Sequence, residues 1–346
     1  WAAKGLVPAA VLGHSVGEFA AAVVAGVLPL ETAARLVVER GRLMQTLPTG
    51  GAMAAVFATE AVVQAALAAV GHAGGMSGRA VAGPVSRLAV AGINGPQEVV
   101  VSGDETALRE LLAHLAAEGV RSETLKVSHA FHSPLMAPIE AAFAAATHGL
   151  APAPASCKIY STLTGALVEG ADFATAEYWQ RQLRASVRFH EALGAALQGP
   201  IDAVLEIGPH PVLAGLGQRA LPQATVPWLA SLRRGREDGA TMAQAVAALY
   251  VRGAVDDHSG ALGARWRGRM ALPHYPFQRV RHWVGSVDAP AEVALDAFAG
   301  SAAAAMAITA GTQAPARAAS LAARQATNAP PLLGERLALP GGETLY

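Results

Sequence analysis

The stretch AAVLGHSVGEFAAAVVAGVL, residues 9–28, places a serine between two glycines where one apolar segment meets another. Residues 9–12 are typical of a buried strand, and residues 16–28 are typical of a helix. A strand, a sharp turn and a helix with Gly-x-Ser-x-Gly at the turn form a nucleophile elbow. We therefore predict that Ser15 is a nucleophile. The alternative is a chance match in a chain rich in alanine and glycine.

The elbow also predicts roles for the residues around the serine. Gly13 and Gly17 lack side chains, so the strand and the helix can approach each other closely. Ser15 is then exposed at the helix N-terminus, where developing negative charge is favoured. The backbone amide of Val16 is placed to donate a hydrogen bond to an oxyanion.

A second pattern lies in the helix that we predict from about Leu30 to Leu47. Arg40 falls in the middle of its apolar face, whereas the neighbouring charged residues fall on the opposite face. A guanidinium group on a buried face is costly unless it has an anionic partner. Two interpretations stay open, namely an internal salt bridge and bidentate binding of a substrate carboxylate.

Ser15 requires a base, and the segment SHAFHSPLM, residues 128–136, offers His129 and His132. His14 is a competing candidate because it lies directly beside the serine. The two histidines of HAFH are also spaced as a metal pair, but no third ligand stands out in the sequence.

The composition excludes several classes of protein. Of the 346 residues, 52% are hydrophobic and 15% are charged, which is not the composition of a disordered chain. The 26 basic and 26 acidic residues balance, so the chain has no basic field for nucleic acid. No apolar run reaches the roughly 20 residues of a membrane helix. The single cysteine, Cys157, suits a reducing cytoplasm and excludes an internal disulfide framework.

The order of predicted elements indicates an α/β fold with an insertion. Residues 52–127 show the order β-α-β-β-α-β of a ferredoxin-like unit, in which residues 71–83 are a Gly-rich loop. A capping box from Ser102 to Glu105 is predicted to begin its second helix. After Ser128 the α/β alternation of the larger body returns. We expect one continuous helix over residues 177–197 and another between 230 and 253.

Six segments, in this order and spacing, resemble the acyltransferase domain of modular type I polyketide synthases. They are GHSVGE (13–18), ERGRLMQ (39–45), INGPQEVVVSG (93–103), HAFHSPLM (129–136), EIGPHPVL (206–213) and LPHYPFQRVRHWV (272–284). The resemblance implies an α/β-hydrolase-like body with an inserted ferredoxin-like subdomain.

The resemblance also implies the chemistry. Ser15 would be the acylated nucleophile, His132 its general base, and Arg40 the residue that binds the free carboxylate of the extender unit. The further substrate-binding residues would be His14, Val16, Asn94, His129 and Phe131. The donor would be an acyl-CoA and the acceptor the phosphopantetheine thiol of an acyl carrier protein, with no bound cofactor or metal. No third triad member is evident, and the resemblance implies a Ser-His dyad oriented by backbone carbonyls.

The motif around the base predicts the extender unit. In the family, His-Ala-Phe-His goes with malonyl and Tyr-Ala-Ser-His with methylmalonyl. Phe131 would fill the space that a 2-methyl group needs, and Val16 agrees with the malonyl type. The alternatives are a methylmalonyl-selective enzyme, a lipase or patatin-like hydrolase, and a non-catalytic docking module. A buried arginine facing the substrate argues against the hydrolase, and the retention of Ser15, Arg40 and His132 argues against the docking module.

The resemblance further divides the chain into parts of a cytoplasmic megasynthase. We expect the body at 1–50 and 128–225, the small subdomain at 51–127, a post-acyltransferase linker region at 226–284, an Ala-rich linker at 285–328 and the start of a dehydratase-like domain at 329–346. The neighbours would be a ketosynthase and that dehydratase-like domain. The family's Gly-Gln-Gly segment, which completes the oxyanion hole, would precede Trp1, so we expect a fragment with little or no activity by itself.

Overall fold

The computed structural model describes residues 1–73, 87–151, 153–171, 175–255, 337–338 and 344–345. The chain forms two compact units, Trp1–Arg269 and Met270–Tyr346. In the second unit, β10 (Leu337–Ala338) and β11 (Thr344–Leu345) pair antiparallel. In the described part of the chain, no helix is both long and apolar enough to cross a membrane.

The body of the first unit is built around short strands. One sheet has the order β1-β6-β7 and is formed by β1 (Ala10–Leu12), β6 (Lys158–Ser161) and β7 (Ala166–Val168). β1 runs parallel to β6, with Leu12 opposite Tyr160. β8 (Val204–Glu206) and β9 (Trp228–Ala230) form a separate parallel pair.

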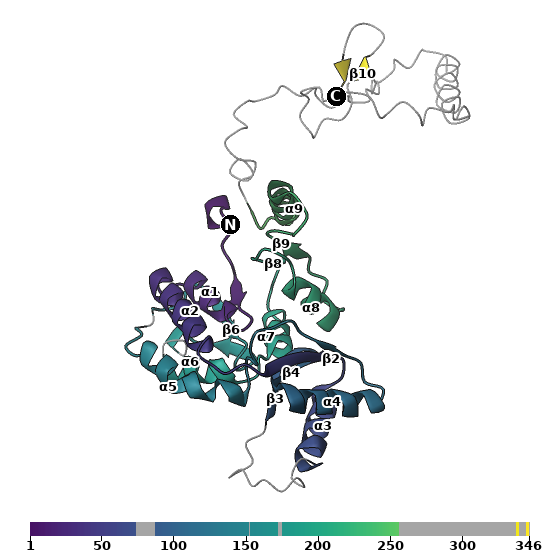
Figure 1. Ribbon diagram of the computed structural model, residues 1–346. Coiled ribbons are helices and arrows are strands. Elements are labelled where there is room, and N and C mark those ends of the chain that lie inside the picture. The colour runs from purple at the N-terminus through teal and green to yellow at the C-terminus, as the bar shows by residue number, and fades with distance from the viewer. Residues whose placement is uncertain (74–86, 152, 172–174, 256–336, 339–343, 346) are drawn as a thin grey trace, which may run out of the picture. The chain divides into compact units, whose positions relative to one another are not determined.

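Four helices of the body, labelled in Figure 1, share one hydrophobic core cluster with Ile159 of β6. They are α1 (Gly17–Val24), α2 (Leu30–Met44), α5 (Ala137–Ala146), which the 3₁₀ turn η3 (Pro134–Met136) precedes, and α6 (Ala176–Arg184). Large buried side chains fill the space between them, and the rings of Phe19 and Trp179 stack with centroids 3.9 Å apart. This packing fixes α1, and with it the turn that precedes α1.

The inserted subdomain has the predicted order of elements. These are β2 (Gly51–Val56), α3 (Glu60–Ala73), β3 (Leu88–Gly95), β4 (Glu98–Asp104), α4 (Glu105–Ala117) and β5 (Ser122–Thr124). Its antiparallel sheet has the strand order β3-β4-β2-β5, and α3 and α4 pack against it (Figure 1). This is the ferredoxin-like arrangement, so the predicted fold class is confirmed. The Gly-rich loop lies outside the described residues from residue 74 onward.

The predicted capping box of α4 is wrong. The N-cap is Asp104, whose carboxylate accepts a hydrogen bond from Ala107 N. Ser102 lies in β4 and is fully buried. β4 continues to Asp104, because residues 102–104 keep their ladder to β2.

The predicted continuous helix over 177–197 is also wrong, because it breaks into α6 and α7 (Phe189–Ala196). Ala185 is extended, with φ −69° and ψ 157°. Val187 N donates to Ala91 O, and Val187 O accepts from Ile93 N. The segment 185–188 therefore adds a short parallel bridge to β3, which local sequence periodicity cannot reveal.

The C-terminal part of the body contains elements that the sequence did not indicate. α8 (Leu213–Ala220), β7 and β9 were not anticipated. α9 (Asp238–Tyr250) begins later than expected, because Glu237 caps it by accepting from Gly239 N and Ala240 N. Residues 256–284 of the predicted linker region at 226–284 lie outside the described residues, as does the predicted Ala-rich linker at 285–328.

Candidate active site

Ser15 occupies a strained turn between β1 and α1. Its φ of 53° is in the left-handed region, which residues with a side chain rarely adopt. A Cβ on Gly13 would come within 2.2 Å of the backbone of Gly17, so Gly13 is required for the close approach. A Cβ on Gly17 would meet nothing within 4 Å, so the expectation that both glycines are needed holds only for Gly13.

The structure brings His132 to Ser15 from the loop between β5 and η3. Ser15 Oγ and His132 Nε2 are 2.5 Å apart. His132 is 4% exposed, and its own φ of 54° is also left-handed. His132 Nδ1 donates to the carbonyl oxygen of Ala185, 2.9 Å away. This bond places the hydrogen on Nδ1 and leaves the Nε2 lone pair for the serine proton.

The electrostatic environment keeps His132 neutral. Burial, followed by the positive charge of Arg40, lowers the pKa of His132 to about 3. A backbone hydrogen bond to Ala185 opposes this shift only in part. At neutral pH the imidazole is therefore an unprotonated base.

Arg40 is buried in α2 at 7% exposure. Within the described residues it makes no ion pair, so the internal salt bridge considered above is not found there. Its Nε is buried without a hydrogen-bond partner. Burial lowers the pKa of Arg40 to about 10, which still leaves the group charged at neutral pH. A buried cation of this kind is suited to binding an anion.

His14 and Asn94 lie together and contact each other. His14 Nε2 and Asn94 Oδ1 are 2.9 Å apart, and the ring of His14 lies against that of Phe189. Burial lowers the pKa of His14. Among the described residues Ser15 Oγ donates its hydrogen bond to His132, whereas the competing candidate His14 is hydrogen-bonded to Asn94.

The remaining predicted residues are close to Ser15 or His132 in the sequence. Val16 is the N-cap of α1, and its side chain is 43% exposed. Phe131 packs against the core clusters of both the body and the small subdomain. His129 is hydrogen-bonded through Nδ1 to Ser128 Oγ, and its ring lies 6.2 Å from that of Phe131.

Sequence reasoning missed the residues that support the dyad. Gln182 Nε2 donates to the backbone oxygen of Ser15 at 2.7 Å, and Ala185 provides the carbonyl for His132. Glu18 is completely buried beneath the elbow. A backbone carbonyl leaves no pattern in a sequence, but the burial of Glu18 could have been inferred from its place inside the GHSVGE motif.

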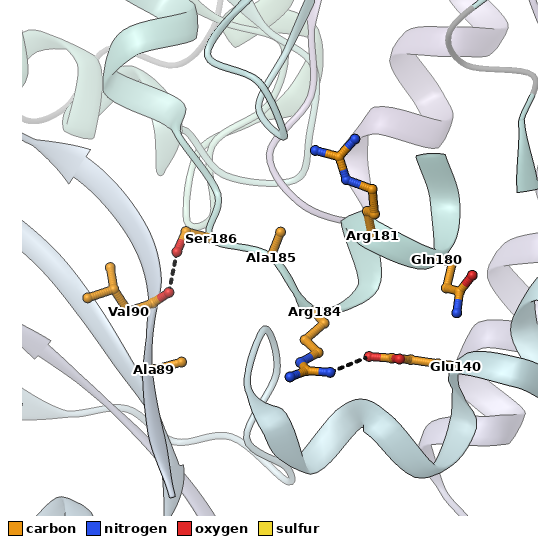
Figure 2. Close-up of a pocket in the computed structure, with 8 residues that line it drawn as sticks. All are labelled: Ala89, Val90, Glu140, Gln180, Arg181, Arg184, Ala185 and Ser186. Atoms are coloured by element: carbon orange, nitrogen blue, oxygen red, sulfur yellow. Dashed lines mark hydrogen bonds and ion pairs between the residues drawn. The ribbon is translucent and has the colours of Figure 1, made fainter. Parts of the chain in front are cut away.

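A cleft of about 490 Å³ is lined in part by Ala185, whose carbonyl accepts the hydrogen bond from His132 (Figure 2). Its walls include Ala185 and Ser186 from the segment between α6 and α7, and Val90 from β3. Arg184 and Glu140 form an ion pair at 3.3 Å on its rim. None of the predicted site residues lines this cleft, and no cluster of three metal-ligating side chains occurs among the described residues.

Comparison with known proteins gives consistent matches. The acyl transferase domain family matches residues 1–256. Polyketide synthase GfsA of Streptomyces halstedii is 40% identical over 80% of this chain, and mycoketide-CoA synthase of Mycobacterium tuberculosis is 40% identical over 84%. The chain spans only 4% and 6% of the length of these two synthases.

Solved structures agree with the sequence matches. The acyltransferase domain from the second module of the salinomycin polyketide synthase is 39% identical, with a TM-score of 0.70 over 80% of this chain and 62% of that one. FabD from Acinetobacter baumannii is 27% identical, with a TM-score of 0.61 over 71% of this chain and 74% of that one. The chain therefore belongs to the acyl transferase domain family and is an acyltransferase domain of the type found in modular polyketide synthases.

Proposed function

We propose that this acyltransferase loads malonyl from CoA onto Ser15 and then onto the phosphopantetheine thiol of an acyl carrier protein. The observation that carries the proposal is the 2.5 Å contact between Ser15 Oγ and His132 Nε2 at a strained elbow. This pairing of nucleophile and base is the arrangement that acyl transfer requires.

In the first half-reaction, Ser15 Oγ attacks the thioester carbon of malonyl-CoA while its proton passes to His132 Nε2. The carbonyl oxygen becomes an oxyanion, toward which the Val16 amide at the start of α1 would donate. The carbon–sulfur bond then breaks, and the CoA thiolate takes the proton from His132. The products are the serine ester and free CoA.

The second half-reaction reverses these roles. The phosphopantetheine thiol gives its proton to His132 and its sulfur attacks the ester carbon. When the carbon–oxygen bond breaks, Ser15 Oγ takes back the proton. No net proton is consumed over the two steps, so one base serves both.

Arg40 would select a substrate that carries a free carboxylate. Its charge is buried, unpaired within the described residues, and close enough to His132 to lower the pKa of that imidazole. A planar guanidinium binds a carboxylate through two parallel hydrogen bonds. Phe131 favours malonyl over methylmalonyl. Its ring packs against two core clusters, so the side chain has little freedom to move away from a 2-methyl group.

The partners follow from the reaction. The acceptor is an acyl carrier protein, and the neighbours we propose are a ketosynthase and a dehydratase-like domain of the same polypeptide. The domain boundaries given above belong to this proposal.

Intact mass spectrometry tests the proposal. The polypeptide that carries this chain is mixed with malonyl-, methylmalonyl- and acetyl-CoA in equal amounts, and the adduct is located by digestion. We expect a malonyl adduct on Ser15 that disappears when a carrier protein bearing phosphopantetheine is added. An adduct lost to water at the same rate without a carrier protein would indicate a hydrolase instead.

A further inference from the structure

Glu18 is a carboxyl group that the reaction above does not use. It lies in the first turn of α1, three residues after Ser15, and is 0% exposed. Its Oε1 accepts from Thr162 N at 2.5 Å, and its Oε2 accepts from the Tyr178 hydroxyl at 3.2 Å. Glu18 makes no ion pair within the described residues. Its other hydrogen-bond partners there include the hydroxyls of Ser161 and Thr162, so Tyr178 is its titratable partner.

The partners of Glu18 hold the backbone on both sides of the nucleophile. Thr162 Oγ1 is 3.0 Å from Glu18 Oε1 and also 3.0 Å from the carbonyl oxygen of Gly13. Gln182, whose side chain also hydrogen-bonds Glu18, donates from Nε2 to the carbonyl oxygen of Ser15 at 2.7 Å. The carboxyl group therefore connects the two residues that restrain a turn with an unfavourable φ.

The hydrogens of this network can be counted. The Thr162 hydroxyl has one hydrogen but two oxygen neighbours at 3.0 Å, Glu18 Oε1 and Gly13 O. If Glu18 were ionised, one of these contacts would bring two lone pairs together. A protonated Glu18 can donate to Thr162 Oγ1, whose own hydrogen then goes to Gly13 O. Both contacts of the Thr162 hydroxyl then have a hydrogen. In the whole network, the hydroxyls of Thr162, Ser161 and Tyr178 share three hydrogens among five oxygen–oxygen contacts, and a protonated Glu18 supplies a fourth.

We propose that Glu18 is a positioning residue that works as a neutral acid, holding the Ser15 elbow in its strained geometry through Thr162 and Gln182. Burial raises the pKa of Glu18 above its usual range, against the hydrogen bonds that lower it, and this agrees with the hydrogen count. Neutrality also suits the chemistry, because a carboxylate three residues from Ser15 would oppose the oxyanion that forms at the elbow.

This inference rests on the proposed acylation of Ser15, and two substitutions separate its parts. Glu18→Gln keeps a donor and an acceptor without charge, so we expect the parent rate of Ser15 acylation and an unchanged rate profile from pH 6 to 9. Glu18→Ala removes the link to both Thr162 and Gln182. We expect kcat for acylation to fall about 10²-fold with KM unchanged, because the nucleophile is misplaced while the substrate site is intact.

A matched core variant controls for lost stability. Phe143→Leu removes volume from the same core cluster on α5, away from the elbow, and should lower the unfolding temperature without changing kcat. A Glu18→Gln variant as slow as Glu18→Ala would overturn the neutral acid. A Glu18→Ala variant as fast as the parent would overturn the positioning role.

An infrared measurement tests the protonation state without relying on activity. The difference spectrum between the parent chain and Glu18→Gln at pH 7 should contain the carbonyl band of a protonated carboxylic acid. Bands of an ionised carboxylate in its place would overturn the neutral acid even if Glu18→Ala fails to fold. If the parent itself forms no adduct on Ser15, the proposed function fails, whereas the infrared result still decides the state of Glu18.

Discussion

Two histidines lie within reach of the nucleophile, and the structure favours one of them as the base. His132 contacts Ser15 Oγ, whereas His14 is hydrogen-bonded to Asn94. We predict that His132→Ala slows acylation and transfer about 10²- to 10⁴-fold, the usual contribution of a positioned general base. Ser15→Ala should abolish the adduct. If His14→Ala slows the chemical steps more than His132→Ala, the base is assigned to the wrong residue.

Arg40 should control which acyl group is loaded. In Arg40→Ala a malonyl carboxylate would enter an apolar pocket without its partner, at a cost on the order of several kcal/mol. Acetyl-CoA has no carboxylate and should lose little. We therefore predict a marked rise in the acetyl-to-malonyl ratio of adducts, measured by mass in a competition. Arg40→Lys, which keeps the charge but not the planar fork, is the matched control, and an unchanged ratio in Arg40→Ala would leave the residue a structural role only.

Phe131 should limit the size of the extender unit. We predict that Phe131→Ser raises the methylmalonyl-to-malonyl ratio by about 10- to 200-fold, since one methyl group is worth about 1–3 kcal/mol in a pocket. Phe131→Tyr, which keeps the volume, should retain the malonyl preference. A ratio that stays constant in Phe131→Ser would mean that another side chain sets the limit.

Two of the candidate site residues could be proposed from the sequence because they leave a local signal. Ser15 stands in a strand–turn–helix pattern, and Arg40 stands on an apolar helix face. His132 could be ranked above His14 only through the family resemblance, because its partner lies 117 positions away in the chain. The support from Ala185 and Gln182 could not be predicted, because it depends on where α6 ends and on which carbonyls face the dyad.

At the level of single elements, a pair of substitutions can test which residue, Asp104 or Ser102, caps the N-terminus of α4. Burial alone would raise the pKa of Asp104, but the hydrogen bond from Ala107 N and the nearby Arg87 lower it overall. We predict that Asp104→Ala destabilises the chain by about 1 kcal/mol in urea unfolding at pH 7. Ser102→Ala should cost less, because its buried hydroxyl has no partner among the described residues. A larger loss of stability in Ser102→Ala than in Asp104→Ala would instead support the capping box that begins at Ser102.

The errors in predicting helices and strands have two causes, tertiary contacts and short strand length. The segment 185–188 leaves the helix to bond with β3, and β4 continues past Ser102 to keep its ladder with β2. Both are tertiary contacts that override local periodicity. The short strands β7 and β9 contain only three residues each, which is too few for an alternating pattern to be distinguished.

At the scale of the whole molecule, buried histidines should make the fold sensitive to acid. The unfolded chain protonates His132 near its ordinary pKa of 6.5, whereas the folded state resists protonation down to about pH 3. The unfolded state therefore binds more protons in this range, and stability falls as the pH drops below 6.5. Glu18, whose pKa is raised, acts in the opposite direction.

We predict that the unfolding temperature of the parent chain falls more between pH 7 and pH 5 than that of His132→Gln, measured by calorimetry. The comparison isolates His132, because Glu18 and His14 are present in both proteins. Equal falls in the two proteins would show that His132 already titrates in the folded state.

The segment 185–188 has a consequence for building hybrid synthases. Its first residue, Ala185, accepts a hydrogen bond from His132 of one subdomain, while Val187 two positions later is hydrogen-bonded to the edge strand of the other. If the small subdomain is exchanged by cutting the chain only where the subdomain begins and ends, β3 comes from the donor synthase. The segment 185–188 that pairs with it still comes from the parent. Crossover sites chosen so that 185–188 travels with β3 would keep the donor's pairing, and such chimeras should retain more of the parent turnover.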